Sequence, residues 1–510
     1  MALLKDPKSK EFMKMILEKS KKQTKSSTPT VRQGGSLINK IQNIQELVQK
    51  RLGHYADELQ LIQTEEDLIA YIDKAIENDV LDIDTETTGL DPFTNHIVGV
   101  CLYTPGLKAA YVPMYHISYI TNIRLNNQLD NEVVAKQFQR CVDAGTKLIF
   151  FNAKFDIRMI RHSLGVYMEP AWDGFIAGKC LKENEEEGSL KYLWKKYCSE
   201  NKDAPHFTFD KMFKGLRFDL IPITTAYLYA AMDAKMTHEL YEFQKPYLDK
   251  TSKVCQDLDM TRLADLYHNI ELPIITITAD IEDRGVVIDK DFAHELSIKY
   301  HAQMEEELNK FYAELDKYKD RINAYLATHP QTKLENPINI GSPTQLAELF
   351  YDILQVDPPD KRNPRGTGVD ILKAMNHPLC KLILDYRGTQ KLLSTYIDKL
   401  PEAVNSVTGK LHAAFKQYGT DTGRYASADP NLQNIPSSEK SIRLMFISER
   451  EYEAEILDNT LYLLFGDVVK TTQGKVFSHE LKPGMVILDS SGQYTIKNIT
   501  QEGNKVIIQL

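Results

Sequence analysis

The sequence lacks the features of a secreted, zinc-binding or membrane-spanning chain. Its six cysteines form no CxxC pair, which argues against a disulfide framework, a zinc site and a CxxC redox pair, so we expect buried thiols. No segment approaches the roughly 20 continuous apolar residues that span a bilayer. The N-terminal residues carry charges where a signal peptide needs its apolar core. These absences predict a cytoplasmic chain without membrane contact.

An overall excess of positive charge is missing as well. The chain has 62 basic and 71 acidic side chains and a net charge of −9, a balance that by itself points away from a nucleic-acid-binding protein. The basic residues gather locally, because the first 35 residues hold eight lysines and Arg32. This arm is either a solvated tail or a contact for nucleic acid.

The residue pattern divides the 510-residue chain into four parts. After the basic arm (1–60), residues 61–250 alternate apolar strand patterns with helical stretches, as an α/β domain does. Residues 251–447 are mainly helical. Residues 448–510 consist of short β-rich runs separated by turns, which predicts a small all-β tail.

Two capping signals place helix starts within these parts. Thr64 precedes an apolar helical pattern, with Asp67 three residues on. Ser342 is followed by a first-turn proline and then by Gln345, again three residues on. Between these signals, an apolar stripe through residues 290–328 predicts a long amphipathic helix or a helix pair.

The acidic residues of the α/β part carry most of the chemistry. Asp84 and Glu86 occupy alternate positions of a strand pattern, so both carboxylates point to one face. Such a pair alone is usually a solvated edge, but Asp156 follows another buried strand, and Tyr229 and Asp233 lie one helical turn apart. Four carboxylates could hold two divalent ions about 4 Å apart for attack of water on a phosphodiester. Oxygen ligands select Mg²⁺ or Mn²⁺.

The segments DIDTETTGL, NAKFD and YAAMD resemble, in this order, the three motifs of the DEDDy branch of 3′–5′ exonucleases. The resemblance implies a ribonuclease H-like mixed sheet with helices, acting on a single-stranded DNA 3′ end. It implies that Asp84, Glu86, Asp156 and Asp233 bind the metal ions and that Tyr229 positions the attacking water. Leu90 matches the apolar residue that wedges near the terminal base, and Asn152 becomes a DNA contact. RNA as substrate fits the acids equally well.

The run YGTDTGRYASADPNLQNIPSSEKSIRLMF combines hydrogen-bond donors with glycine turns suited to phosphate and minor-groove contacts. It belongs to a stretch, residues 265–447, that resembles the thumb and the start of the palm of family A DNA polymerases of the polymerase I type, in the form carried by phages. The resemblance implies binding of primer-template DNA. Arg424 would approach the primer terminus, and Arg387 and Lys391 would lie near the duplex backbone. The remaining DNA-contact candidates are Thr420, Asn431, Gln433 and Asn434.

The resemblance breaks where the catalytic aspartate of the palm should follow. Asp458 stands at about the right distance after Phe446, but its surroundings do not match, and the later palm and finger motifs do not occur. We therefore expect polymerisation only if a C-terminal polymerase chain completes the site.

The tail replaces the palm at this point. Its segments GDVVKTTQGKVF and ELKPGMVILDSSGQYTIKNI resemble the opening β-segments of an intein (Hint) domain. An intein begins with Cys or Ser, and Ser448 is the candidate splice junction. A degenerate insertion and a coding break that truncates the polymerase remain alternatives.

These features predict the 3′–5′ exonuclease (proofreading) and primer-template-binding portion of a DNA-directed DNA polymerase. The alternative is a split-intein precursor or assembly subunit whose isolated exonuclease is inactive. A 3′-end degradation assay distinguishes the two.

Overall fold

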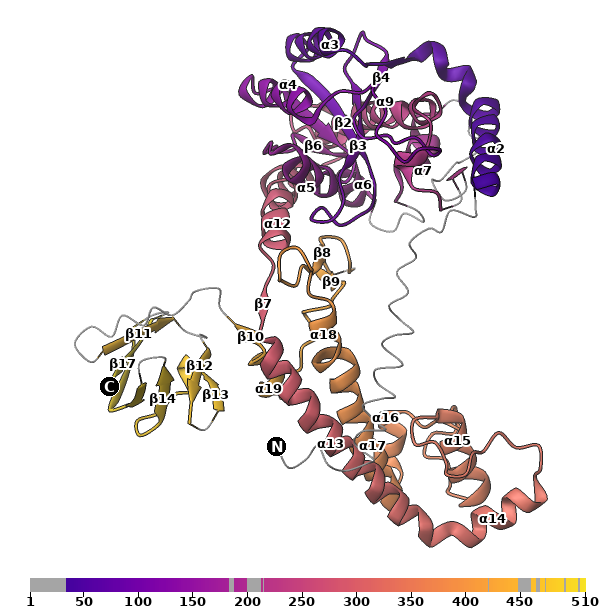
Figure 1. Cartoon of the computed structure of the whole chain (residues 1–510), viewed down its shortest axis with the longest axis vertical. Coiled ribbons are helices and arrows are strands. Elements are labelled where there is room, and N and C mark those ends of the chain that lie inside the picture. The colour runs from indigo at the N-terminus through magenta and orange to yellow at the C-terminus, as the bar shows by residue number, and fades with distance from the viewer. Residues whose placement is uncertain are drawn as a thin grey trace. The chain divides into compact units, whose positions relative to one another are not determined.

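The structure is a computed structural model, and it divides into two compact units, one up to Ile275 and one from Thr276 onward (Figure 1). The basic segment before Gly34, Ser448 and Asp458 lie outside the described residues. The described residues are 34–182, 188–199, 212–213, 215–420, 422–447, 460–464, 468–472, 474–489, 492–502 and 505–510.

A six-stranded mixed sheet forms the centre of the first unit, in the order β1-β4-β3-β2-β5-β6. Strands β2, β3 and β4 form an antiparallel meander, while β1 runs parallel to β4, and β5 and β6 run parallel to β2. The predicted mixed α/β fold is confirmed. The strands are β1 (Leu59–Leu61), β2 (Val80–Thr87), β3 (Ile97–Tyr103), β4 (Ala109–Pro113), β5 (Lys147–Phe150) and β6 (Trp172–Asp173).

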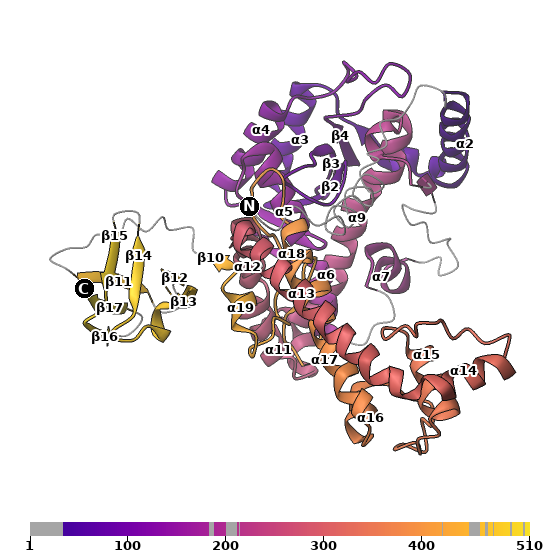
Figure 2. The ribbon, with the colours of Figure 1, turned by 60° about the horizontal axis from the view of Figure 1, so that its bottom comes forward.

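Helices cover both faces of this sheet. Figures 1 and 2 show α3 (Glu65–Glu77), α4 (Asn131–Asp143) and α5 (Ala153–Leu164) on one face, and α9 (Ile223–Leu248) on the other. Against α9 packs α2 (Gly34–Leu52), so the described part of the predicted arm belongs to this core. Further helices of this unit are η2 (Gly53–Glu58), α6 (Gly174–Leu181), α7 (Leu190–Tyr197), η3 (Phe218–Leu220), α10 (Lys253–Asp257), α11 (Thr261–Leu266) and η4 (Tyr267–Glu271).

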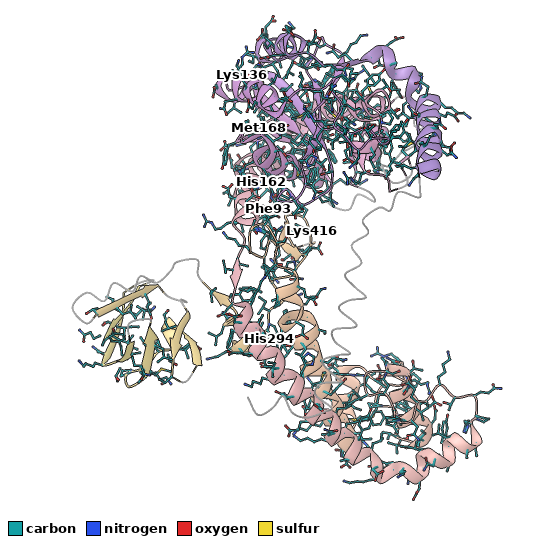
Figure 3. All side chains as sticks on the ribbon, viewed as in Figure 1. Phe93, Lys136, His162, Met168, His294 and Lys416 are labelled. Atoms are coloured by element: carbon teal, nitrogen blue, oxygen red, sulfur yellow. The ribbon has the colours of Figure 1, made fainter. Side chains whose placement is uncertain are left out.

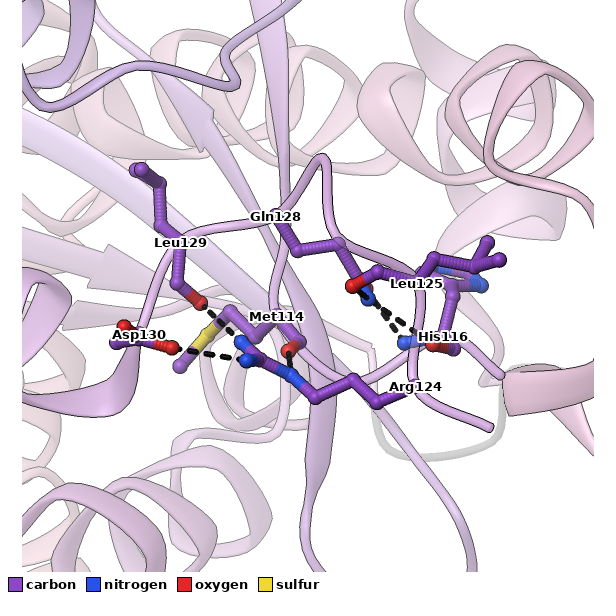
Figure 4. Close-up of polar contacts among 7 residues, drawn as sticks. All are labelled: Met114, His116, Arg124, Leu125, Gln128, Leu129 and Asp130. Atoms are coloured by element: carbon purple, nitrogen blue, oxygen red, sulfur yellow. Dashed lines mark hydrogen bonds and ion pairs between the residues drawn. The ribbon is translucent and has the colours of Figure 1, made fainter. Parts of the chain in front are cut away.

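The connection from β4 to α4 is closed by two side chains (Figure 4). Gln128 accepts a hydrogen bond from the backbone N–H of His116 (2.5 Å) and donates to its carbonyl (2.9 Å). Arg124 donates to the carbonyls of Met114 and Leu129, both at 3.0 Å, and pairs with Asp130 at 2.9 Å. These bonds hold His116 fully buried beneath the loop.

The second unit is helical before its tail, as predicted. The long amphipathic stripe forms a helix pair, α13 (Lys290–Leu315) and α14 (Lys319–Thr328). A hairpin of β8 (Ala414–Lys416) and β9 (Ala426–Ala428) presents the polar polymerase-like loop. The other elements are α12 (Pro273–Arg284), which crosses the unit boundary, β7 (Val287–Ile288), η5 (Asp316–Tyr318), α15 (Pro343–Ala347), η6 (Glu348–Ile353), α16 (Val369–Ala374), α17 (Pro378–Leu392), η7 (Leu393–Ile397), α18 (Lys399–Glu402), α19 (Lys440–Arg443) and β10 (Phe446–Ile447).

The described residues of the tail form two small antiparallel sheets, β11-β17-β16 and β13-β12-β14-β15. Alternate apolar side chains fill a common core, among them Leu461, Val469, Ile487 and Ile508. The β-rich prediction is confirmed. The strands and helix are β11 (Thr460–Leu464), β12 (Val468–Thr471), β13 (Gly474–Phe477), η8 (Ser478–Glu480), β14 (Val486–Asp489), β15 (Gly492–Thr495), β16 (Asn498–Glu502) and β17 (Lys505–Gln509).

Two expectations drawn from absences can be compared with the structure. None of the six cysteines, all of which lie in described residues, forms a disulfide; Cys180 and Cys198 are half-buried and the other four are buried. In the part of the chain that the structure describes, no helix is both long and apolar enough to cross a membrane.

Candidate functional site

Three carboxylates meet between β2 and α9. Asp84 and Glu86 project from alternate positions of β2 toward α9, and Asp233 projects from α9 toward them. One ligand oxygen from each of the three lies within 4.8 Å of the others. Side chains at alternate strand positions point to one face, so Asp84 and Glu86 both face α9, where Asp233 meets them.

Asp156 reaches β2 from the first turn of α5. Strand β5 pairs with β2 only as far as Asp82, so the N–H of Thr85 needs another acceptor. Asp156 Oδ1 accepts that N–H at 3.0 Å and the Thr85 hydroxyl at 2.7 Å. Burial and the neighbouring Asp84 raise the pKa of Asp156. Asp156 therefore borders the acidic cluster, with one oxygen committed to Thr85.

Tyr229 lies one helical turn before Asp233, and its ring is buried against Phe213, with 4.8 Å between the ring centroids. Burial raises the pKa of the Tyr229 phenol, against the opposing influence of Lys191. The phenol is therefore a neutral hydrogen-bonding group at neutral pH rather than a base.

Lys191 on α7 completes the site, and sequence reasoning missed it. Its ammonium forms an ion pair with Asp233 Oδ2 at 2.9 Å and lies 3.9 Å from the centroid of the Tyr229 ring. Although burial disfavours the charge, Asp233 and Tyr229 outweigh it and raise the pKa of Lys191. The pattern SLKYLWKKYC contains three lysines, and nothing in their spacing distinguishes the one that faces the acids.

The surroundings of the acidic cluster disfavour the ionised form of its carboxyl groups. Burial raises the pKa of Asp84 to about 7, with Asp233 adding to the shift. Burial, Asp84 and Asp233 together raise the pKa of Glu86 well above its usual value. Among the described residues, Asp233 Oδ1 is buried without a hydrogen-bond partner. Crowded carboxylate oxygens with an unused buried lone pair suit hard divalent cations such as Mg²⁺ or Mn²⁺.

Two further buried aspartates support the cluster. Asp82 lies two positions before Asp84 and pairs with His238 of α9 at 2.8 Å. Asp173 accepts four backbone N–H groups at 2.8 to 3.2 Å, two at the start of α5 and two at the start of α6. It thereby fixes the turn of α5 that carries Asp156. The strand alternation around Asp84 could have identified Asp82, whereas no local pattern indicates the role of Asp173.

The predicted DNA contacts near the cluster are accessible. Leu90, on the loop after β2, is 82% exposed. The same loop is anchored by Phe93, whose ring centroid lies 4.6 Å from that of His162 on α5 (Figure 3). Asn152 is also exposed, in a left-handed conformation with φ of 68° just before α5.

In the second unit, all the predicted DNA contacts but one are exposed. These are Lys391, Thr420, Arg424, Asn431, Gln433 and Asn434. Arg387 differs, because its half-buried guanidinium donates to the Thr367 carbonyl at 2.5 Å. Its Nη2 is buried without a hydrogen-bond partner in the described part of the chain. Arg387 thus interacts with the interior of its own unit.

Two family models match the chain. Residues 59–249 match a model described as 3′–5′ exonuclease, and residues 302–458 match DNA polymerase family A. The chain therefore combines a 3′–5′ exonuclease domain with part of a family A polymerase domain.

Curated relatives specify this combination further. DNA polymerase I of Pseudomonas aeruginosa is 30% identical over 395 residues, covering 75% of this chain and 40% of the relative. DNA polymerase I of Borreliella burgdorferi is 27% identical over 380 residues, covering 74% and 37% respectively. The chain is DNA polymerase I-like, and it spans about two fifths of the length of these relatives.

A solved structure shares the fold. The POL domain of Pol1 from M. smegmatis, in complex with DNA primer-template and dNTP, aligns with a TM-score of 0.53 at 18% identity. The alignment covers 81% of this chain and 61% of that chain.

Proposed function

We propose that the first unit is a 3′–5′ exonuclease that shortens DNA strands with two Mg²⁺ or Mn²⁺ ions. The observation that carries the proposal is the acidic cluster of Asp84, Glu86 and Asp233, whose ligand oxygens lie within 4.8 Å of one another. The match of residues 59–249 to the exonuclease model supports the same activity.

Each side chain has a defined part in this reaction. Asp84, Glu86 and Asp233 would bind the metals, and Asp156 would contribute the oxygen that Thr85 leaves free. Bound divalent ions supply an activated water and neutralise the charge of the leaving oxygen. The neutral Tyr229 hydroxyl donates or accepts a hydrogen bond to orient the water. Leu90 and Asn152 contact the terminal nucleotides from the exposed rim.

Degradation of a 5′-labelled single-stranded oligonucleotide in Mg²⁺ tests the activity and its direction. The wild-type chain should produce a ladder that shortens from the 3′ end. Asp84→Asn should lose at least about a hundredfold in rate, since it removes a metal ligand while keeping shape. Glu77→Gln, at an exposed position of α3, is the matched control and should retain full rate. Equal activity of Asp84→Asn and wild type would refute the assignment, and preferential cleavage of an RNA oligonucleotide would redirect it to RNA.

The second unit, in this proposal, binds primer-template DNA through the β8–β9 loop and Lys391. Polymerisation would require a second, C-terminal chain that provides the remaining palm and finger motifs. The match of residues 302–458 to the family A polymerase supports the binding role. Primer extension by this chain with and without a candidate downstream polypeptide tests the requirement, and extension by the chain alone contradicts it.

For the tail we propose a Hint-like fold of a split intein in a phage-type polymerase, with Ser448 as splice junction. The small β-sheets after the polymerase-like part support this fold. Mixing the chain with the downstream polypeptide should produce a ligated polymerase, and Ser448→Ala should prevent ligation. If ligation never occurs and the exonuclease is idle alone but active in a complex, the alternative of an assembly subunit holds.

A further inference from the structure

Lys191 connects a flanking helix to the acidic cluster. Its ammonium lies 2.9 Å from Asp233 Oδ2, and the two side chains are 19% and 13% exposed. Helix α7 is anchored by the buried Leu190 and Leu193, and by a hydrogen bond from the Trp194 indole to Glu239 of α9 at 2.5 Å. The ammonium is therefore delivered by a fixed helix rather than by a loose surface side chain.

The Lys191 ammonium lies beside a cluster of like-charged acidic groups. Asp84, Glu86 and Asp233 place three carboxylates within 4.8 Å, an arrangement that is strongly repulsive in a partly dry site. A cation paired with Asp233 reduces that repulsion. The Tyr229 ring, 3.9 Å from the ammonium, adds a cation–π contact that helps to hold it there.

We propose that Lys191 is a tethered cation that neutralises Asp233 when the site is metal-free and competes with divalent ions for that carboxylate. This inference rests on the proposed function, since it assumes that the acidic cluster binds metal. Lys191 acts through Asp233 and has two effects. The lysine stabilises the metal-free fold, and it weakens metal binding so that the ions can exchange.

Direct titration of Mn²⁺ measures the competition without relying on activity. The full-length chain, Lys191→Met and the control Lys196→Met are titrated while the electron paramagnetic resonance signal of free Mn²⁺ is followed. Lys196 sits on the same helix, 5.5 Å from the Tyr192 and Tyr197 rings, and is thus a lysine with similar aromatic contacts. We expect Lys191→Met to bind Mn²⁺ about tenfold more tightly than wild type, the effect of losing one half-buried ion pair. Lys196→Met should match wild type.

Asp84→Asn separates this inference from the proposed function. If wild type binds Mn²⁺, Asp84→Asn loses it and Lys191→Met binds equally or more weakly, the competition is refuted while the metal site stands. If neither wild type nor Lys191→Met binds Mn²⁺, the proposed two-metal function fails, and the inference fails with it.

Thermal unfolding provides a second readout that a merely structural lysine would not share. Both tryptophans, Trp172 and Trp194, belong to the first unit, so their fluorescence reports its unfolding within the intact chain. Lys191→Met should lower Tm in EDTA, and saturating Mn²⁺ should abolish or reverse the difference. An equal loss of Tm in EDTA and in Mn²⁺ would show that Lys191 only packs against its neighbours.

Discussion

The Asp156 carboxylate accepts both the backbone N–H and the hydroxyl of Thr85, at 3.0 and 2.7 Å. Thr85 lies on β2 between the two acids Asp84 and Glu86, whose side chains point to the other face of the strand. Thr85 of β2 thus fixes Asp156 of α5 next to Asp84 and Glu86 of the same strand. This contact sets the relative position of elements 71 residues apart.

Thr85→Val should therefore damage the site while preserving the shape of the strand. It removes the hydroxyl donor to Asp156 but keeps the backbone donor, so we expect the exonuclease rate to fall by about tenfold or more. The free energy of unfolding should fall by about 1–2 kcal/mol, since a buried carboxylate loses a hydrogen bond. The rate of 3′-end degradation and tryptophan fluorescence in urea measure the two effects.

Thr85→Ser is the matched control, because it retains the hydroxyl and removes only a methyl group. It should keep an activity within about threefold of wild type. If Thr85→Val and Thr85→Ser are equally active, the hydroxyl does not position Asp156.

Local sequence patterns predict much of the fold. The caps at Thr64 and Ser342 are confirmed, each accepting a hydrogen bond from the backbone N–H three residues on. Apolar runs bounded by turn residues predict four of the six strands of the first sheet, namely β2, β3, β4 and β5. Strands β1 and β6, with three and two residues, are too short to show an alternating pattern, so the sequence does not predict them.

Residue spacing predicts the local geometry of the candidate site but not its tertiary contacts. The alternation along β2 and the helical turn from Tyr229 to Asp233 are local geometry, which residue spacing encodes. The ion pair of Lys191 with Asp233 joins residues 42 positions apart, and it depends on how α7 docks against α9. Likewise, only tertiary packing turns Arg387 inward, where a lysine or arginine on a helix would ordinarily be solvated.

Leu90 offers a test of substrate contact without a stability effect. Because this side chain is 82% exposed, Leu90→Ala should change the free energy of unfolding by less than about 0.5 kcal/mol. Loss of an apolar contact with the terminal base should raise KM for single-stranded DNA about fivefold or more. The control Ile120→Ala removes a 73% exposed apolar side chain from another loop of the same unit and should leave KM unchanged. An unchanged KM for Leu90→Ala would remove Leu90 from the substrate site.

The two arginines that the sequence predicts as DNA contacts, Arg387 and Arg424, should behave differently. Arg424 is exposed on the loop after β8, so Arg424→Ala should weaken binding of a fluorescent primer-template and reduce the slope of log K against log salt by about one. Arg387→Met should change this affinity by less than about twofold, because its guanidinium contacts the Thr367 carbonyl and burial lowers the pKa of Arg387. Anisotropy titrations at several salt concentrations measure both. A large salt-dependent loss for Arg387→Met would place Arg387 on the DNA instead.

His116 should make the stability of the first unit depend on pH. Its Nδ1 lies 2.8 Å from the Ile221 carbonyl and its Nε2 lies 2.7 Å from the Tyr111 hydroxyl. Burial lowers the pKa of His116 to about 4, although the Ile221 carbonyl and Asp219 oppose the shift. The fold therefore favours the neutral ring.

The sign of the effect follows from this lowered pKa. The unfolded chain takes up a proton near pH 6.5 and the folded chain only near pH 4, so the stability that His116 contributes is complete above about pH 6.5 and is lost as the pH falls toward 4. Between pH 7.5 and pH 5 the loss amounts to about 2 kcal/mol. The difference in unfolding free energy between wild type and His116→Gln, followed by tryptophan fluorescence, should shrink by that amount. The difference for His54→Gln, at an exposed histidine of the same unit, should change far less, and equal pH dependence of the two variants would contradict the role of burial at His116.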